Sequence, residues 1–453
     1  MTKRRDGGVG VSPTKQRALL SAIITLIAVL SVCIYVGAAA GDGGPGDDGK
    51  NSSGARSPHN SAAPASAGSW VGAWAAAPVG GEAGTEQTGM AGRSVRNVVH
   101  TSAGGTSARI TLSNLYGQAP LTLTHASIAV AAGHNSSAAA KGTMRRLTFG
   151  GATSVTVPAG QQTLSDAVRL QVPSGADLLV TTYSLTASGP VTYHPYARQI
   201  SYLADGDRTE DATGTPYRER TAIWRYLTAV DVLSSQADGT VVAFGDSITD
   251  GSTSTESANR RWPDAFSQRL RAAVAAGQDV PRYSVVNEGI SGNQILVGKA
   301  GRPVENQSGL DRFTRDVLGR PNVKVVVVDL GVNDVLHGAR ADHILSGLRT
   351  LVRQAHAHGI KVVGATLMPF GGYPRFSAAR EVVRQQVNAG IRSGTVYDAV
   401  VDFDKALRDP YDARRLAPEY DSGDHLHPSD RGYRQMARTV DLADLKGAVP
   451  AQL

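Results

Sequence analysis

The feature that most constrains the fold is a set of short apolar runs in the second half of the chain. They are TVVAFG (240–245), YSVVNEG (283–289), VKVVVVDLG (323–331), IKVVGATL (360–367) and VYDAVVDF (396–403). Strands of parallel sheets are covered on both faces and therefore form near-continuous hydrophobic runs. The runs predict strands of one parallel sheet.

Amphipathic segments separate these runs. The segment ADHILSGLRTLVRQAHAHG (341–359) places apolar side chains on one helical face and is expected to stop at Gly359. That face comprises Ile344, Leu348, Leu351, Val352 and Ala355. Alternating buried strands and helices predict an α/β domain over residues 239–445, and ligands of such sheets bind beyond the carboxyl ends of the strands.

Polar residues follow several of the runs at those carboxyl ends. They are Gly245, Asp246 and Ser247; Gly289, Gly292 and Asn293; Gly331, Asn333 and Asp334; and, near the end of the chain, Asp424, His425 and His427. Each set follows a strand or opens a helix, so we expect all four to converge on one rim of the sheet.

Together these sets contain one candidate for each role in acyl transfer. A serine nucleophile needs a base, usually histidine, and an acid that orients the imidazole, here Ser247, His427 and Asp424. The developing oxyanion needs preorganised donors, for which the N–H groups of Ser247 and Gly292 and the side-chain amide of Asn333 are candidates.

Spacing alone leaves other assignments open. His425 could be the base and Asp421 the orienting acid. Asn333 could be a helix N-cap, and the role of Asp246 is undetermined. The string DSGDHLH (421–427) could also hold a metal, but that would leave the other three sets without a purpose.

The strings GDSITDG, GISGN, GVND and DHLHP together resemble the four motif blocks of the SGNH hydrolases, the GDSL-type esterase/lipase superfamily. The resemblance implies a flavodoxin-like three-layer α/β/α fold with parallel sheet. It also implies a catalytic triad of Ser247, Asp424 and His427, with an oxyanion hole of Ser247, Gly292 and Asn333. The first block departs from the strict GDSL string at Ile248 and Thr249.

Residues 70–235 have a different pattern. Short alternating stretches such as SARITLSNL and DLLVTTYSL, separated by Gly and Pro, predict an all-β sandwich or jelly-roll-like domain. The strings WVGAWAAAP and ARITLSNLYG resemble the β-rich domain that precedes the catalytic domain in some actinobacterial-type secreted members of the superfamily. Trp70 and Trp74 are candidates for core packing or for a carbohydrate-stacking surface.

The first part of the chain predicts export. Residues 1–17 hold five basic residues against one acidic residue, so they carry +4 of the net charge of +7. They form a basic cytoplasmic n-region before an apolar segment at 18–40, which is either a cleaved signal peptide or a single transmembrane anchor. Residues 41–69 are a flexible linker rich in Gly, Ser, Ala and Pro. The bulk of the chain is thus expected to be extracellular or in the cell envelope.

These patterns predict a serine esterase that forms an acyl-enzyme. Its substrate would be a short-chain ester, as a small molecule or as acetyl groups on a polysaccharide. A lipase or lysophospholipase-type acylhydrolase and a non-catalytic glycan-binding envelope protein are the alternatives. No metal or organic cofactor is required. The small charge that remains outside the first segment argues against nucleic-acid binding. Membrane contact is expected only through the N-terminal segment.

Overall fold

The computed structural model describes residues 68–297 and 307–447, which fall in a single compact unit. The predicted n-region, the signal or anchor segment and nearly all of the linker lie outside the described residues. Within the two described ranges, no helix combines the length and the apolar character needed to span a bilayer.

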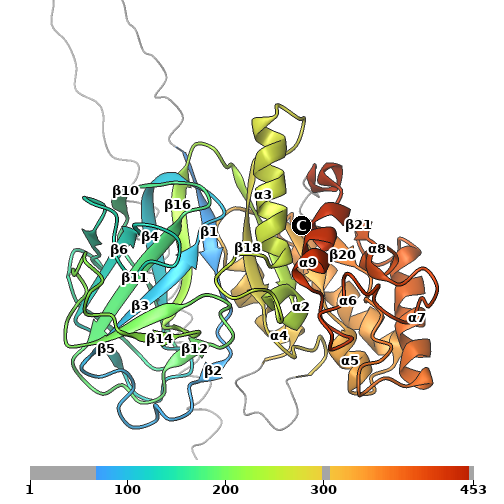
Figure 1. Cartoon of the computed structure of the whole chain (residues 1–453), viewed down its shortest axis with the longest axis horizontal. Helices are drawn as coiled ribbons and strands as arrows, with labels where there is room; N and C mark the ends of the chain where they lie inside the picture. Colours follow the sequence, from blue (N-terminus) through green and yellow to red (C-terminus); the bar gives the residue numbers. More distant parts are fainter. Residues whose placement is uncertain (1–67, 298–306, 448–453) are drawn as a thin grey trace, which may run out of the picture. The chain divides into compact units, whose positions relative to one another are not determined.

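The α/β part, in which Figure 1 labels β18, β20 and β21, is built on a parallel sheet whose strand order is β18-β17-β19-β20-β21. In chain order this is 2-1-3-4-5, the order of flavodoxin-like sheets, with its switch point between β17 and β19. The strands are Gly239–Gly245 (β17), Tyr283–Gly289 (β18), Val323–Asp329 (β19), Lys361–Ala365 (β20) and Ala399–Val401 (β21). The predicted fold class is confirmed for this part.

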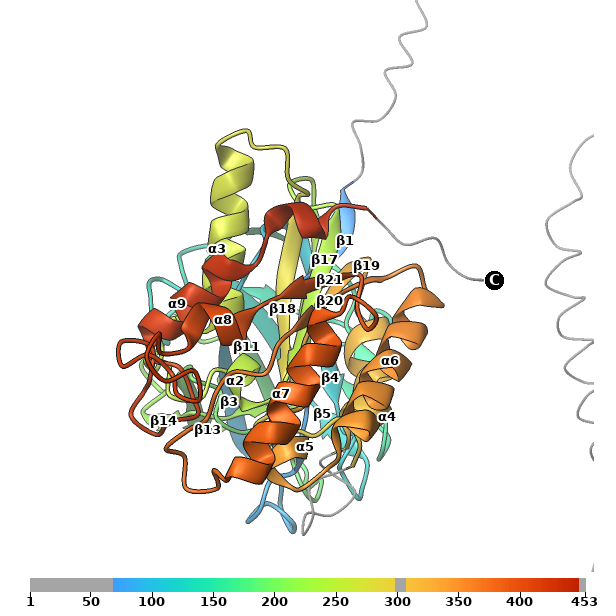
Figure 2. The same cartoon turned by 90° about the vertical axis from the view of Figure 1, so that its right-hand side faces the viewer.

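Helices cover both faces of this sheet. On one side α3 contacts α9, and on the other α6 contacts α4 and α7 (Figure 2). The helices are Ser247–Asp250 (α2), Trp262–Ala275 (α3), Gly309–Phe313 (α4), Val332–Leu336 (α5), Ala341–His356 (α6), Ala378–Arg392 (α7), Phe403–Leu407 (α8) and Asp430–Thr439 (α9), with a π-helical turn at Thr314–Leu318 (η1) and a 3₁₀ turn at Leu442–Leu445 (η2). The apolar face predicted for α6 is buried, although the helix ends three residues before Gly359.

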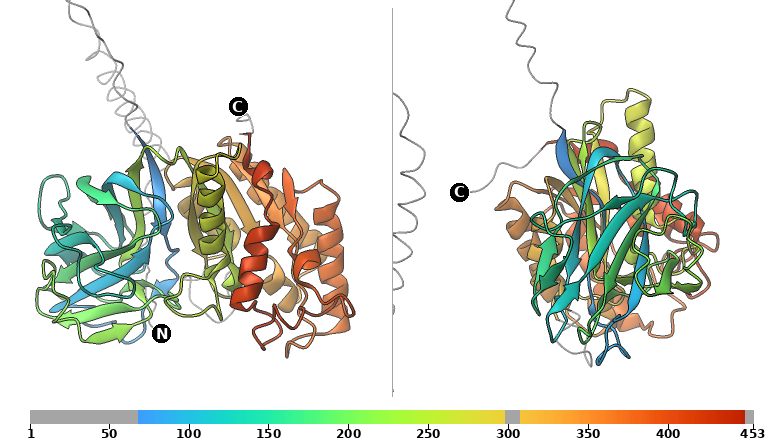
Figure 3. Two further views of the ribbon diagram at one scale, coloured as in Figure 1. Left: turned by 45° about the horizontal axis from the view of Figure 1, so that its top comes forward. Right: turned by 90° about the vertical axis from the view of Figure 1, so that its left-hand side faces the viewer.

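The β-rich part is a sandwich of antiparallel sheets, as predicted (Figure 3). One large sheet has the order β1-β16-β4-β10, with β9 also paired to β4, and the other has the order β14-β13-β3-β11-β6-β7. Smaller sheets are β15-β12-β2 and β5-β8. The strands are Ser69–Ala75 (β1), Gly80–Gly81 (β2), Arg93–His100 (β3), Gly105–Ser113 (β4), Leu121–Leu123 (β5), His125–Val130 (β6), Arg145–Arg146 (β7), Val155–Val157 (β8), Gln162–Leu164 (β9), Val168–Val172 (β10), Asp177–Ser184 (β11), Thr192–His194 (β12), Ser201–Asp205 (β13), Glu219–Thr221 (β14), Trp224–Arg225 (β15) and Leu227–Ser234 (β16).

The β-rich part packs directly on the α/β sheet. Ala75 of β1 belongs to the same buried apolar cluster as Val286 of β18. A Cβ added at Gly72 would lie only 2.9 Å from Val286 Cγ1, so glycine permits this close approach. The Gly72 N–H donates to Thr240 Oγ1 at 3.1 Å. The β-rich part has a separate main apolar cluster, but Ala75 and Ala229 join the cluster of the α/β part, so the β-rich part can contribute directly to a site on the sheet edge.

Candidate active site

The tight turn after β17 places Ser247 at the carboxyl end of that strand. Asp246 caps α2, because its Oδ1 accepts from the Ile248 N–H at 3.0 Å. A Cβ at Gly245 would lie 2.1 Å from Thr249 Oγ1, so the turn requires glycine there. The apolar strand and its Gly-Asp-Ser ending thus place the hydroxyl at the sheet rim.

Ser247 is joined to His427 and Asp424 by a relay of hydrogen bonds. His427 Nε2 lies 2.8 Å from Ser247 Oγ, and His427 Nδ1 lies 2.6 Å from Asp424 Oδ2. Asp424 Oδ1 accepts from the N–H groups of Leu426 and His427 at 2.9 and 2.8 Å. Burial opposes ionisation of Asp424, but the bonds from His427 and from the backbone outweigh it and hold its pKa well below the usual range. An ionised Asp424 keeps the proton on Nδ1, so Nε2 is free to accept from the serine.

The alternative histidine and acid form a separate pair. His425 Nδ1 lies 2.6 Å from Asp421 Oδ2, and the described residues show no contact of either side chain with Ser247. Of the assignments that spacing left open, His427 and Asp424 are the ones brought to the serine.

The candidate oxyanion donors line the same pocket. Ser247, Gly292, Asn333 and His427 border a cavity of about 320 Å³. Gly292 has φ +77°, in the left-handed region that favours glycine. Asn333 lies inside α5, whose N-cap is Gly331, so the N-cap interpretation of Asn333 is wrong. Its Nδ2 donates to Asp246 Oδ2 at 3.2 Å, which fixes the amide and leaves a second N–H.

Buried acids lie behind these donors. Burial raises the pKa of Asp246 well above its ordinary value, and the neighbouring Asp329 raises it further. Burial also raises the pKa of Asp329 to about 7 and that of Asp334 to about 6. The raised pKa of Asp246 favours its neutral form, which accepts an N–H of Asn333 without placing a full negative charge beside this candidate oxyanion donor. The undetermined role of Asp246 is therefore to cap α2 and to orient Asn333.

A buried histidine from the β-rich part supports the turn that carries Gly292, one of the candidate oxyanion donors. His194 of β12 lies with Nε2 3.1 Å from Asp250 Oδ1, and its Nδ1–H donates to the Ala77 carbonyl at 2.7 Å. Asp250 Oδ2 accepts from the N–H and the hydroxyl of Ser291, at 3.1 and 2.6 Å. Ser291 directly precedes Gly292. The sequence patterns do not predict His194, although the string TYHPY (192–196) combines a histidine with two tyrosines.

The pocket mouth contains further side chains that the motifs did not indicate. Tyr196 and Val79 come from the β-rich part, Tyr373 and Arg375 from the loop before α7, and His337 from the end of α5. Loop 369–377 thus borders the pocket through two of its residues.

The two N-terminal tryptophans lie away from this pocket. Trp74 is buried and packs edge-on against Trp224, with ring centroids 4.8 Å apart, as core packing requires. Trp70 carries the Arg109 guanidinium 4.3 Å above its ring. Neither lines the pocket that holds Ser247.

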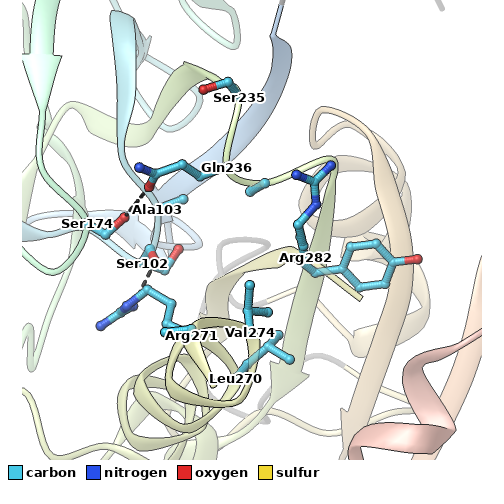
Figure 4. A pocket seen from close by; sticks show the side chains of 12 residues that line it. Ser102, Ala103, Ser174, Ser235, Gln236, Leu270, Arg271, Val274 and Arg282 are labelled. Atoms are coloured by element: carbon cyan, nitrogen blue, oxygen red, sulfur yellow. Dashed lines mark hydrogen bonds between the residues drawn. The ribbon is translucent and has the colours of Figure 1, made fainter. Parts of the chain in front are cut away.

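A second cavity, of about 440 Å³, lies where α3 meets the β-rich part (Figure 4). Its lining includes Ser102, Ser174, Leu270, Arg271 and Val274 but none of the predicted site residues. No cluster of three or more His, Cys, Asp or Glu side chains suited to a metal ion occurs in residues 68–297 and 307–447. Ser247, Gly292, Asn333 and His427 all line the smaller pocket, and Asp424 hydrogen-bonds His427 there.

Comparison with known proteins agrees with this placement. Residues 243–435 match the model of the GDSL-like lipase/acylhydrolase family. No curated protein matched the chain in sequence. The match does not extend to the β-rich part, so the resemblance of that part to actinobacterial-type members stays a prediction.

Similar solved structures cover less than half of the chain. A GDSL-like lipase from Bacteroides thetaiotaomicron is 20% identical, with 47% of this chain and 91% of that chain covered and a TM-score of 0.33. A carbohydrate acetylesterase family member from Sinorhizobium meliloti is 17% identical, with 44% and 94% covered and a TM-score of 0.36. Likenesses this distant carry no argument about substrate.

Proposed function

We propose that this chain, whose residues 243–435 belong to the GDSL-like lipase/acylhydrolase family, hydrolyses short-chain acyl esters outside the cytoplasmic membrane. Membership makes it a serine hydrolase that acts on ester bonds. The observation that carries the proposal is the relay from Asp424 through His427 to Ser247, with contacts of 2.6 and 2.8 Å, at the wall of a pocket.

The relay supplies each step of ester hydrolysis. Ser247 Oγ attacks the ester carbonyl while its proton passes to His427 Nε2. The carbonyl oxygen becomes an anion that accepts from the N–H groups of Ser247 and Gly292 and from the Asn333 amide. His427 then gives the proton to the alcohol oxygen as the ester C–O bond breaks. The alcohol departs, and the acyl group stays on Ser247. A water that loses its proton to His427 attacks the acyl-serine and releases the acid, and Ser247 regains its proton.

The pocket supports a short acyl group. Its volume of about 320 Å³ must hold the reacting part of the ester, and its lining mixes polar residues with few aliphatic ones, chiefly Val79, Pro195 and Leu426. A long acyl chain gains its binding energy from continuous apolar contact, and the described part of this lining does not offer it. Acetyl esters of small alcohols and of polysaccharides are therefore the leading substrates, ahead of lipids.

Location outside the cytoplasmic membrane is supported by the sequence alone. Five basic residues in 1–17 precede the apolar segment 18–40, an order typical of exported or anchored proteins. A fusion of residues 1–69 to a reporter that is active only outside the cytoplasm tests this point. Absence of reporter activity in a cell that makes the fusion would contradict it.

The activity is tested with the full chain. Nitrophenyl esters of increasing acyl length and acetylated xylan are assayed with the unchanged protein, with Ser247→Ala and with Ser393→Ala, a control at the end of α7. We expect hydrolysis that is fastest for acetyl and is lost only in Ser247→Ala. Fastest hydrolysis of long-chain esters would favour the lipase alternative. Absence of any hydrolysis, with binding to xylan, would favour the glycan-binding alternative.

A further inference from the structure

The mouth of the active-site pocket carries a cation, Arg375, that no acid of the described residues neutralises. Arg375 lies in the loop between β20 and α7 and is exposed. Among the described residues, no carboxylate forms an ion pair with Arg375, whereas Arg384 and Arg392 of the adjoining helix α7 each bind one or more. Within residues 68–297 and 307–447, no Asp or Glu belongs to the pocket lining. The pocket therefore presents an unneutralised guanidinium.

A fixed imidazole holds this guanidinium beside the oxyanion donor. His337 Nδ1 lies 2.7 Å from the Asn333 carbonyl oxygen, which can only accept, so Nδ1 carries the proton. The lone pair of His337 Nε2 then faces Arg375 Nη1 at 3.4 Å. One N–H of Arg375 Nη1 points to His337 Nε2, and the other N–H groups of the planar guanidinium can bind a ligand. The cation is thereby tied, through one ring, to the backbone of a catalytic residue.

Aromatic side chains border the same opening. Tyr373 precedes Arg375 by two residues, and Tyr196 reaches the pocket from the β-rich part. Tyr196 is 61% exposed and has φ +54°, a conformation that costs energy for a residue other than glycine. Flat apolar faces beside a guanidinium suit a small ring or chain that ends in an anionic group.

We propose that Arg375 forms a carboxylate-binding subsite, and that the preferred substrate is an ester with a carboxylate close to the scissile bond. The carboxylate could belong to the acyl group, as in a dicarboxylic acid monoester, or to the alcohol, as in an acylated acidic sugar. A guanidinium binds a carboxylate through two parallel N–H···O bonds, which fixes both position and orientation. This inference rests on the proposed esterase activity and names the substrate class of the same site.

Matched ester pairs test the subsite on both sides of the ester. The acyl pair is 4-nitrophenyl hydrogen succinate and its methyl ester, and the alcohol pair is 4-acetoxybenzoate and its methyl ester. The quantity measured is kcat/KM for the charged ester divided by that for its neutral partner, in the unchanged protein and in Arg375→Gln, Arg375→Lys and Arg353→Gln. Comparing one ratio between variants cancels the intrinsic reactivities of the esters.

We expect the ratio of one pair to fall about 10- to 100-fold in Arg375→Gln, the range for a charge-assisted hydrogen bond, while the neutral ester changes less than about twofold. Arg375→Lys should retain part of the ratio, because it keeps the charge and loses the fork. Arg353→Gln, on the exposed side of α6, should leave the ratio unchanged. The pair that responds identifies which side of the ester carries the carboxylate.

An unchanged ratio for both pairs in Arg375→Gln would overturn the subsite. If that unchanged ratio came with an equal loss of kcat/KM for charged and neutral esters, Arg375 would have a structural role only. Failure of the proposed function looks different: neither neutral ester would be hydrolysed in a manner that depends on Ser247.

Discussion

Replacement of His194 tests how far the β-rich part supports catalysis. The imidazole is 3% exposed and lies against Asp250, which is 4% exposed and holds Ser291 through two hydrogen bonds. Burial opposes protonation of His194, but the Asp250 carboxylate and its hydrogen bond outweigh burial and raise the pKa of His194 above its ordinary value. The pair is therefore a buried ion pair between the two parts of the molecule.

His194→Ala leaves the buried Asp250 carboxylate without its hydrogen-bonded cation, and only the more distant charge of Arg261 remains. Breaking a buried pair in this way costs about 3–5 kcal/mol, and the lower end is expected because Asp250 keeps both bonds from Ser291. If the Ser291–Gly292 turn shifts, one oxyanion donor is lost, which lowers kcat by up to about 10²–10³. The ion pair stabilises the folded protein fully at a pH below the pKa that His194 has in the unfolded chain. This stabilisation is lost as the pH rises through the raised pKa of His194 in the folded protein. The difference between the two proteins should therefore shrink at alkaline pH.

The assay is chemical unfolding from pH 5 to 9, combined with steady-state hydrolysis of nitrophenyl acetate. His125→Ala is the matched control, because His125 pairs with Asp207 in the β-rich part but both side chains are about one-third exposed. The control should lose no more than about 1 kcal/mol and no activity. Equal losses of unfolding free energy in the two variants, or an unchanged kcat in His194→Ala, would refute the proposed bracing of the turn.

Three further outcomes follow from the site. Asn333→Ala should lower kcat about 10²–10³-fold with little change in KM, and steady-state kinetics that show a change in KM alone would exclude its oxyanion role. Asp424→Asn should lower kcat about 10⁴-fold, because the proton of His427 is then no longer held on Nδ1. Asp421→Asn should have a far smaller effect in the same assay. Burial raises the pKa of Asp329 from 3.8 to about 7, so stability should fall as pH rises across that interval, and unfolding curves of Asp329→Asn should lack this fall.

The arrangement of the α/β part follows from local pattern. The run VVVV from Val325 to Val328 is buried on both faces, and the polar residues after β17, β18 and β19 meet because parallel strands end at one edge. The positions of Ser247, Gly292 and Asn333 at one rim are therefore predictable from the apolar runs that precede them. His427 needs the additional chemical argument that a serine requires a base.

The contributions of the β-rich part could not be predicted in the same way. His194 and Tyr196 reach the site because β1 packs on β18. The sequence periodicity does not indicate which face of the β-rich part packs against the α/β sheet. Arg375 lies in a loop, where side-chain direction depends on contacts such as that with His337 rather than on strand or helix period. Tertiary packing between distant segments, which a single sequence does not encode locally, decides these positions.

In the proposed reaction Ser247 carries the acyl group, and covalent labelling of that side chain tests this role directly. The full chain is treated with a fluorophosphonate, which reacts with activated serines, and the modified peptide is identified by mass spectrometry. We expect one adduct, on Ser247, that appears in step with loss of esterase activity and is prevented by His427→Ala. An adduct on another residue that abolishes activity, or hydrolysis that survives complete labelling of Ser247, would contradict it.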